Sequence, residues 1–240
     1  MKVEASALNQ LLDLQAEDTA MKRLQDRRAA LPEAQRLGEV NERLAELTAD
    51  LEIATKQHDE IAREQDKIEG EMGLADQKIA REEQRLFGGA VSNPKELGAL
   101  QAEVQMLKRK RAEMEDALLE VMVQKEDAAA TLDRLRGEQA AATTEADQLS
   151  ATVAQLTAEI EVELAEHSSK RDALAGPLPD ELLSLYEKIR ASKNGVGAAA
   201  LDRGTCQGCH TQLPNKEVER IKAESGLQRC DNCRRILVVV

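Results

Sequence analysis

Four cysteines in the last 35 residues are the side chains whose types and spacing most clearly indicate a defined chemistry. They form two Cys-x-x-Cys pairs that are separated by 20 residues, namely Cys206, Cys209, Cys230 and Cys233. Zn²⁺ prefers four tetrahedral soft ligands, and each Cys-x-x-Cys turn presents two thiolates to one ion. The spacing therefore predicts one structural Zn²⁺ held by these four cysteines. Two disulfides are the alternative in a secreted chain.

The segments around the cysteines favour a zinc ribbon. Residues 196–202 and 236–240 read as strands, and residues 216–223 between the two knuckles read as a short helix. His210 follows Cys209 directly, but four cysteines already fill the coordination shell, so we expect His210 to stay outside it. Because so small a module buries little apolar surface, metal binding should supply much of its folding free energy.

Other catalytic patterns find no support in the sequence. Residues 195–200 match a GxGxxA phosphate loop superficially, but they follow a predicted helix instead of a strand. The three histidines are scattered, and no HExxH or GxxxxGK[ST] motif occurs. We therefore predict that the protein is not an enzyme and binds no small-molecule substrate. A zinc enzyme, which would need an open coordination position, is a minor hypothesis.

The composition indicates long helices. Of the 240 residues, 42% are hydrophobic and 32% are charged, but one Phe and one Tyr are the only aromatic residues. Such a composition is typical of coiled coils, and it argues against one ordinary globular core. The amino-terminal residues contain no apolar core of an export signal, and no window is apolar enough for a membrane span. We expect a cytoplasmic protein without membrane contacts.

Two heptad seams organise the helical part. Stepping alternately by three and four residues from Leu37 to Leu86 meets mostly apolar residues, and the same rule holds from Leu97 to Ile160. Helix breakers at 87–94 separate the two seams, which is typical of the tip of a hairpin. We predict a mainly α fold: a long antiparallel coiled-coil hairpin over residues 1–176, then a short helix and a small β zinc ribbon over 177–240. A parallel dimer with a break at the glycines is the weaker alternative.

Polar residues interrupt the seams, and four of them lie in the same stretch of the hairpin: His58, Gln65, Arg111 and Lys125. Control of the helix register explains them adequately, although a buried functional site remains an alternative. The basic run 108–111 has two readings as well. It is either an exposed face paired with neighbouring glutamates or a patch for phosphate or an acidic partner.

The chain resembles a bacterial family of coiled-coil hairpin proteins that end in a four-cysteine zinc ribbon. Three stretches carry the resemblance: residues 86–107 at the tip, the helix 178–189, and the segment 206–237 with both knuckles. The resemblance implies an adaptor or chaperone-like role without enzymatic activity, with family members tied to flagellar or secretion-system regulation and in some cases to RNA. One departure concerns Arg234, because the family commonly has glycine after the fourth cysteine. Glycine permits the left-handed turn that a knuckle often needs.

We therefore expect an adaptor, scaffold or chaperone-like regulator that binds protein partners through the hairpin and the ribbon. The alternative is a regulator that binds RNA or DNA through the basic edge of the ribbon. The net charge of −12 and the lack of aromatic rings argue against that alternative. The candidate partner-binding residues are Asn93, Pro94, Lys95, Glu96, Arg234 and Arg235.

Overall fold

The structure is a computed structural model of the chain that describes residues 3–89, 91–224 and 226–240. These residues form five helices and four short strands: α1 (Ala5–Ala29), α2 (Pro32–Phe87), α3 (Pro94–Ala175), α4 (Asp180–Ser192), β1 (Ala198–Asp202), β2 (Thr205–Cys206), α5 (Asn215–Ala223), β3 (Gln228–Arg229) and β4 (Ile236–Val239). The chain divides into two compact units. Unit 1 contains Met1–Arg36 and Leu149–Val240, and unit 2 contains Leu37–Gln148. Helices α2 and α3 contribute residues to both units.

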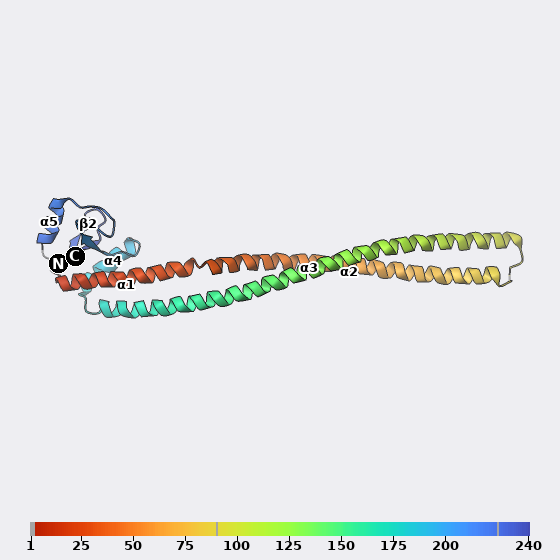
Figure 1. Ribbon diagram of the computed structural model, residues 1–240, viewed down its shortest axis with the longest axis horizontal. Coiled ribbons are helices and arrows are strands. Elements are labelled where there is room, and N and C mark those ends of the chain that lie inside the picture. The colour runs from red at the N-terminus through yellow and green to blue at the C-terminus, as the bar shows by residue number, and fades with distance from the viewer. Residues whose placement is uncertain (1–2, 90, 225) are drawn as a thin grey trace. The chain divides into compact units, whose positions relative to one another are not determined.

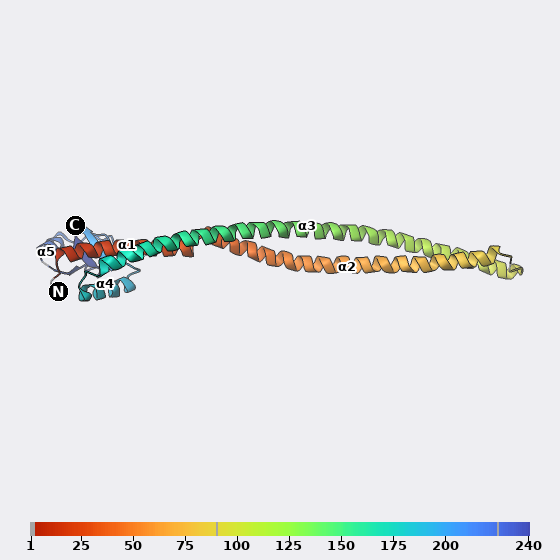
Figure 2. The same cartoon turned by 90° about the horizontal axis from the view of Figure 1, so that it is seen from below.

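Unit 2 is an antiparallel pair of helices, as the heptads predicted. The α2 and α3 segments of this unit run alongside each other in both views (Figures 1 and 2). Their ion pairs show the direction, because Arg43 contacts Glu138 at 3.3 Å while Lys108, further back along α3, contacts Glu83 at 2.6 Å. From one contact to the other, the residue number on α2 rises from 43 to 83 while that on α3 falls from 138 to 108. The two helices therefore form an antiparallel intrachain hairpin.

Apolar seam residues hold the two helices of unit 2 together. Leu47, Ala54, Leu132 and Leu135 form a buried cluster to which both helices contribute. Leucine and alanine are large enough to fill such a two-helix seam, because it has no wide interior. This packing explains why the chain forms a hairpin with almost no aromatic residues.

Unit 1 combines α1, the end of α3, α4 and the ribbon. Leu24 and Leu31 pack against Ile160 of α3, and a second cluster includes Leu11 and Tyr186. Helix α1 ends at Ala29 and α2 begins at Pro32, as expected, because a proline disfavours helical geometry at the residue that precedes it.

The ribbon is a four-stranded sheet with the order β2-β1-β4-β3. The central strands β1 and β4 are parallel, with Ala198 opposite Ile236, and the two outer strands pair antiparallel to them. The short outer strands β2 and β3 lead directly into the two cysteine knuckles. The predicted strands before and after the cysteines thus form the centre of the sheet.

The candidate metal centre

The first knuckle closes at the end of β2. The backbone N–H of His210 donates to the carbonyl oxygen of Cys206 at 2.8 Å, and His210 has a φ of 57°. Gly208 lies inside this turn, where a Cβ atom would lie 2.7 Å from Cδ of Arg235 and 2.9 Å from Cβ of Ala199. The side chain of His210 is exposed, as expected.

The second knuckle repeats this geometry. The backbone N–H of Arg234 donates to the carbonyl oxygen of Cys230 at 2.8 Å, and Arg234 has a φ of 65°. The position after the fourth cysteine therefore does adopt the left-handed conformation that glycine favours. Arg234 occupies it with a Cβ atom, as His210 does in the first knuckle.

The four cysteine sulfurs converge on one point. All four Sγ atoms lie within 4.8 Å of one another, with 3.9 Å between Cys206 and Cys233 and 3.9 Å between Cys209 and Cys230. A tetrahedral ion with Zn–S bonds of about 2.3 Å needs sulfurs separated by about 3.8 Å. A disulfide would instead bring two sulfurs to about 2.05 Å. The donor set and its spacing fit Zn²⁺, and four thiolates leave no open position for a substrate.

The thiols of this cluster lie in different electrostatic surroundings. Burial raises the pKa of Cys206 to about 12 and also raises the pKa of Cys230. A hydrogen bond from Thr211 is the main cause that lowers the pKa of Cys209 to about 6, and Nδ2 of Asn232 lies 3.6 Å from its sulfur. Since Zn²⁺ binds thiolates, metal binding at neutral pH must release protons from the buried pair.

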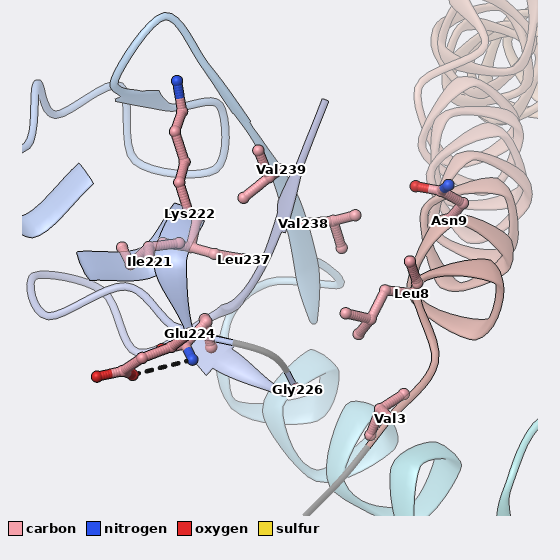
Figure 3. A pocket seen from close by; sticks show the side chains of 12 residues that line it. Val3, Leu8, Asn9, Ile221, Lys222, Glu224, Gly226, Leu237, Val238 and Val239 are labelled. Atoms are coloured by element: carbon pink, nitrogen blue, oxygen red, sulfur yellow. Dashed lines mark hydrogen bonds between the residues drawn. The ribbon is translucent and has the colours of Figure 1, made fainter. Parts of the chain in front are cut away.

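A glutamine of α1 attaches the ribbon to the helices of unit 1. Oε1 of Gln15 accepts hydrogen bonds from the backbone N–H groups of Gly197 and Ala198 at 2.6 and 3.2 Å, and its Nε2 donates to the carbonyl oxygen of Gly195 at 3.0 Å. Further along, Leu8 of α1 faces Val238 of β4 across a groove of about 300 Å³ (Figure 3). The metal-binding sheet therefore packs directly on α1.

A buried polar network strengthens the same junction. The hydroxyl of Tyr186 in α4 donates to Oδ2 of Asp18 in α1 at 2.6 Å, and Nε of Arg171 in α3 donates to Oδ1 of Asp18 at 2.8 Å. Burial, followed by the hydrogen bond to Asp18, raises the pKa of Tyr186 far above its ordinary value. The hydroxyl is therefore a permanent donor at neutral pH.

This network was not predicted from the sequence, although a signal for it exists. Gln15 and Asp18 continue the buried stripe of Leu11 and Leu14 at spacings of three and four residues. Two polar residues on the buried stripe of a helix indicate that a polar partner faces them.

The candidate partner-binding residues occur in both units. At the tip in unit 2, Asn93 to Glu96 are exposed, and Oδ1 of Asn93 accepts a hydrogen bond from the backbone N–H of Lys95 at 3.0 Å. Asn93 thus caps α3. In the ribbon, Arg234 is exposed, whereas the guanidinium of Arg235 donates to the carbonyl oxygens of Val196, Gly208 and Lys193 at 2.8–3.1 Å. Arg235 connects the first knuckle to the segment before β1.

The rest of the described chain offers no second site of this kind. Within residues 3–89, 91–224 and 226–240, the cysteine cluster is the one group of His, Cys, Asp or Glu side chains arranged to hold a metal ion. Every helix in those ranges is also too short or too polar to span a bilayer.

Comparisons with known proteins agree with this architecture. Residues 14–194 match the CT398-like coiled coil hairpin domain, and residues 205–237 match a C4-type zinc ribbon domain. An uncharacterized protein of Mycobacterium tuberculosis (strain H37Rv) is 32% identical, and the similarity covers 99% of this chain and 97% of the relative.

Solved structures show the same fold over the full length. A Mycobacterium smegmatis protein has a TM-score of 0.87 at 28% identity, with both chains covered completely. CT398 of Chlamydia trachomatis has a TM-score of 0.74 at 20% identity, with 98% of each chain covered. The chain belongs to the family of CT398-like coiled-coil hairpin proteins, and its C4-type zinc ribbon carries one structural Zn²⁺.

Proposed function

We propose that this protein is a non-enzymatic, cytoplasmic adaptor that binds protein partners through its helical hairpin. The observation that carries the proposal is the exposure of Phe87 at the tip. Its ring is 80% exposed at the end of α2, whereas Tyr186, the other aromatic residue of the chain, is fully buried. Exposed aromatic rings are frequent anchors in protein interfaces, because they bury a large apolar area at a small entropic cost.

The surroundings of Phe87 support the same role. Leu86 and Phe87 line a groove of about 510 Å³ with Gly98, Gln101 and Val104 of α3. The exposed residues Asn93, Pro94, Lys95 and Glu96 follow in the connection and at the start of α3. We propose that this tip is a contact surface for a protein partner.

The role that we propose for the zinc ribbon is structural. Cys206, Cys209, Cys230 and Cys233 ligate the Zn²⁺, and the folded ribbon then packs on α1 through Gln15. Zinc removal by a chelator should release four thiols and abolish the sheet, while most of the helical circular dichroism remains. A parallel loss of both signals would contradict this separation.

Protein partners are favoured over nucleic acid for two reasons. The three donor nitrogens of Arg235 already bind backbone carbonyls, and Nε of Arg229 donates to the carbonyl oxygen of Arg234 at 2.9 Å. The basic edge therefore presents less free guanidinium than its composition suggests. A single exposed ring also makes a poor platform for stacking bases.

Site-specific photo-cross-linking tests the proposal. A photoreactive phenylalanine analogue at position 87 should capture a discrete protein in cells of the source species. The same analogue at position 74 is a matched control, because Leu74 is 68% exposed in the same unit. The tip is refuted as a contact surface if position 87 gives no product or the same products as position 74. Salt-dependent filter binding of RNA or DNA that is lost in Arg234→Ala would favour the nucleic-acid alternative instead.

A further inference from the structure

The middle of unit 2 contains a stretch in which the hairpin is thinly packed. From 55 to 78 in α2 and from 108 to 131 in α3, every side chain is at least partly exposed, although Ala54, Ile79 and Leu107 at its borders are buried. Within this stretch Nζ of Lys125 donates to Oε1 of Gln65 at 2.9 Å. Polar residues thus take several seam positions in this stretch, and its apolar seam residues stay partly exposed.

An apolar face of α3 lies exposed in this stretch. Leu119, Met122 and Val123 are 57%, 40% and 59% exposed, and their spacing places them on one side of the helix. Met122 also lines a groove of about 250 Å³ between the helices, together with His58, Gln65, Lys125, Glu126 and Ala129. The face formed by Leu119, Met122 and Val123 therefore continues into a groove between α3 and α2.

Acidic side chains surround this apolar face. Residues 112–131 of α3 include six acidic side chains and one lysine, and residues 55–75 of α2 include six acidic side chains and three basic ones. These two segments carry a net charge of −8, whereas the remainder of the chain carries −4. Among the ion pairs of residues 3–89, 91–224 and 226–240, none involves Asp116, Glu120 or Glu126.

The neighbouring basic run neutralises only part of this surface. Lys108 pairs with Glu83 at 2.6 Å, and Arg111 pairs with Asp76 at 3.0 Å and with Glu115. These ion pairs account for Lys108 and Arg111 as part of a solvated face of the hairpin. The negative charge around Leu119 is left for an external partner.

We propose that the apolar face of Leu119, Met122 and Val123 binds a basic amphipathic helix of a partner protein. A helix that lies along α3 places an apolar stripe with i, i+3, i+4, i+7 spacing on this face, and its flanking lysines or arginines meet Asp116 and Glu126. The proposal rests on the adaptor function proposed above, and it specifies the chemistry of one partner segment.

Charge complementarity selects this occupant over a second copy of the chain. A two-fold pairing of the face with itself brings the acidic residues at 115 and 116 close to those at 126 and 127. Like charges at that distance repel. A partner of opposite charge encounters no such penalty, so the face fits a basic segment better than it fits itself.

Binding of a designed peptide tests the proposal. The probe is a fluorescent helical peptide of about 18 residues, which spans about 27 Å, with leucines at i, i+3, i+4 and i+7 and lysines on both borders of the stripe. A matched peptide replaces every lysine with glutamate. Fluorescence anisotropy with the zinc-loaded full chain should show binding of the lysine peptide only, and the affinity should fall as the salt concentration rises.

Surface variants locate the binding site on the chain. The double variant Leu119→Gln/Val123→Gln should weaken binding about tenfold or more, since central apolar anchors dominate such contacts. The charge reversal Asp116→Lys/Glu126→Lys should weaken it about fivefold and flatten the salt dependence. Leu74→Gln is the matched control, because Leu74 is 68% exposed on α2, and it should leave the affinity unchanged.

Three outcomes would overturn the proposal. They are equal binding of the glutamate peptide, unchanged binding by Leu119→Gln/Val123→Gln, and a wild-type dimer in sedimentation that this double variant dissociates. Each outcome leaves the adaptor function intact, because cross-linking at position 87 tests that function independently. Conversely, peptide binding at Leu119 without any cross-linked product at position 87 would support this surface and refute the tip.

Discussion

Replacement of Arg234 by glycine should stabilise the zinc ribbon. Arg234 closes the second knuckle with a φ of 65°, a conformation that costs a residue with a Cβ atom about 1–2 kcal/mol. Glycine removes this strain and keeps the backbone hydrogen bonds at the turn. In one of them the backbone N–H of residue 234 donates to the carbonyl oxygen of Cys230. In the other the carbonyl oxygen of residue 234 accepts from Nε of Arg229.

Two smaller effects oppose the gain. Glycine has more conformational entropy in the unfolded chain, which costs about 0.5 kcal/mol. The variant also loses the ion pair between Arg234 and Asp231, whose 3.8 Å separation and exposed side chains make it worth about 0.2 kcal/mol. The net stabilisation of Arg234→Gly is therefore about 0.3–1.3 kcal/mol.

Competition with a chelator measures this difference as zinc affinity. Because folding of the ribbon is coupled to metal binding, a gain of about 0.3–1.3 kcal/mol corresponds to an affinity for Zn²⁺ about two- to ninefold higher. Arg234→Ala is the matched control, since it loses the same ion pair but keeps the Cβ atom. It should bind Zn²⁺ as the wild type does or slightly more weakly.

His210→Gly offers an independent check at the first knuckle, where φ is 57°. It should also increase the affinity for Zn²⁺, because the two knuckles share one backbone geometry. If Arg234→Gly binds Zn²⁺ no more tightly than Arg234→Ala, the strain at this position does not limit the ribbon and the reasoning is wrong.

Four further substitutions probe the packing of the two units. Tyr186→Phe removes the hydrogen bond to Asp18 and should lower the free energy of unfolding by about 2 kcal/mol in urea titrations. Because the pKa of Tyr186 is raised in the folded state, the wild type should lose this stability advantage progressively above about pH 10. Gly197→Ala places a Cβ atom 2.6 Å from Cδ2 of Tyr186 and should lower the melting temperature, whereas Gly38→Ala, with no atom within 4 Å, should raise it through helix propensity. Leu47→Ala empties a position in unit 2 that is 1% exposed and should cost about 2–4 kcal/mol, measured from the helical circular dichroism; a cost below about 1 kcal/mol would argue against the buried seam.

The spacing of the cysteines was sufficient to predict the metal centre. A Cys-x-x-Cys turn carries its own geometry, so two of them define four ligands wherever the ribbon lies. Arg234 shows the same locality, because its left-handed φ follows from the turn, and the resemblance to the family had pointed to this position. The side chain of Arg235 could not be placed in this way. Its three carbonyl partners at 193, 196 and 208 come together only when the ribbon folds.

The heptads likewise predicted the hairpin, since a period of 3.5 residues marks the buried stripe of each helix. Local periodicity leaves open whether two stripes meet within one chain or between two chains. The ion pair from Arg43 to Glu138 and the buried cluster of Leu47 with Leu132 show that they meet within one chain.

The sequence by itself determined the elements whose signals are local: the knuckles, the helices and the break at Pro32. Only the tertiary structure decided how these elements pack against one another, because the pattern of residues within one segment does not identify which distant segment it contacts. The docking of the ribbon on α1 depends on Gln15 and on a Tyr186–Asp18 hydrogen bond that spans 168 residues. The exposure of Leu119 is equally a tertiary property, since it depends on where the partner helix runs.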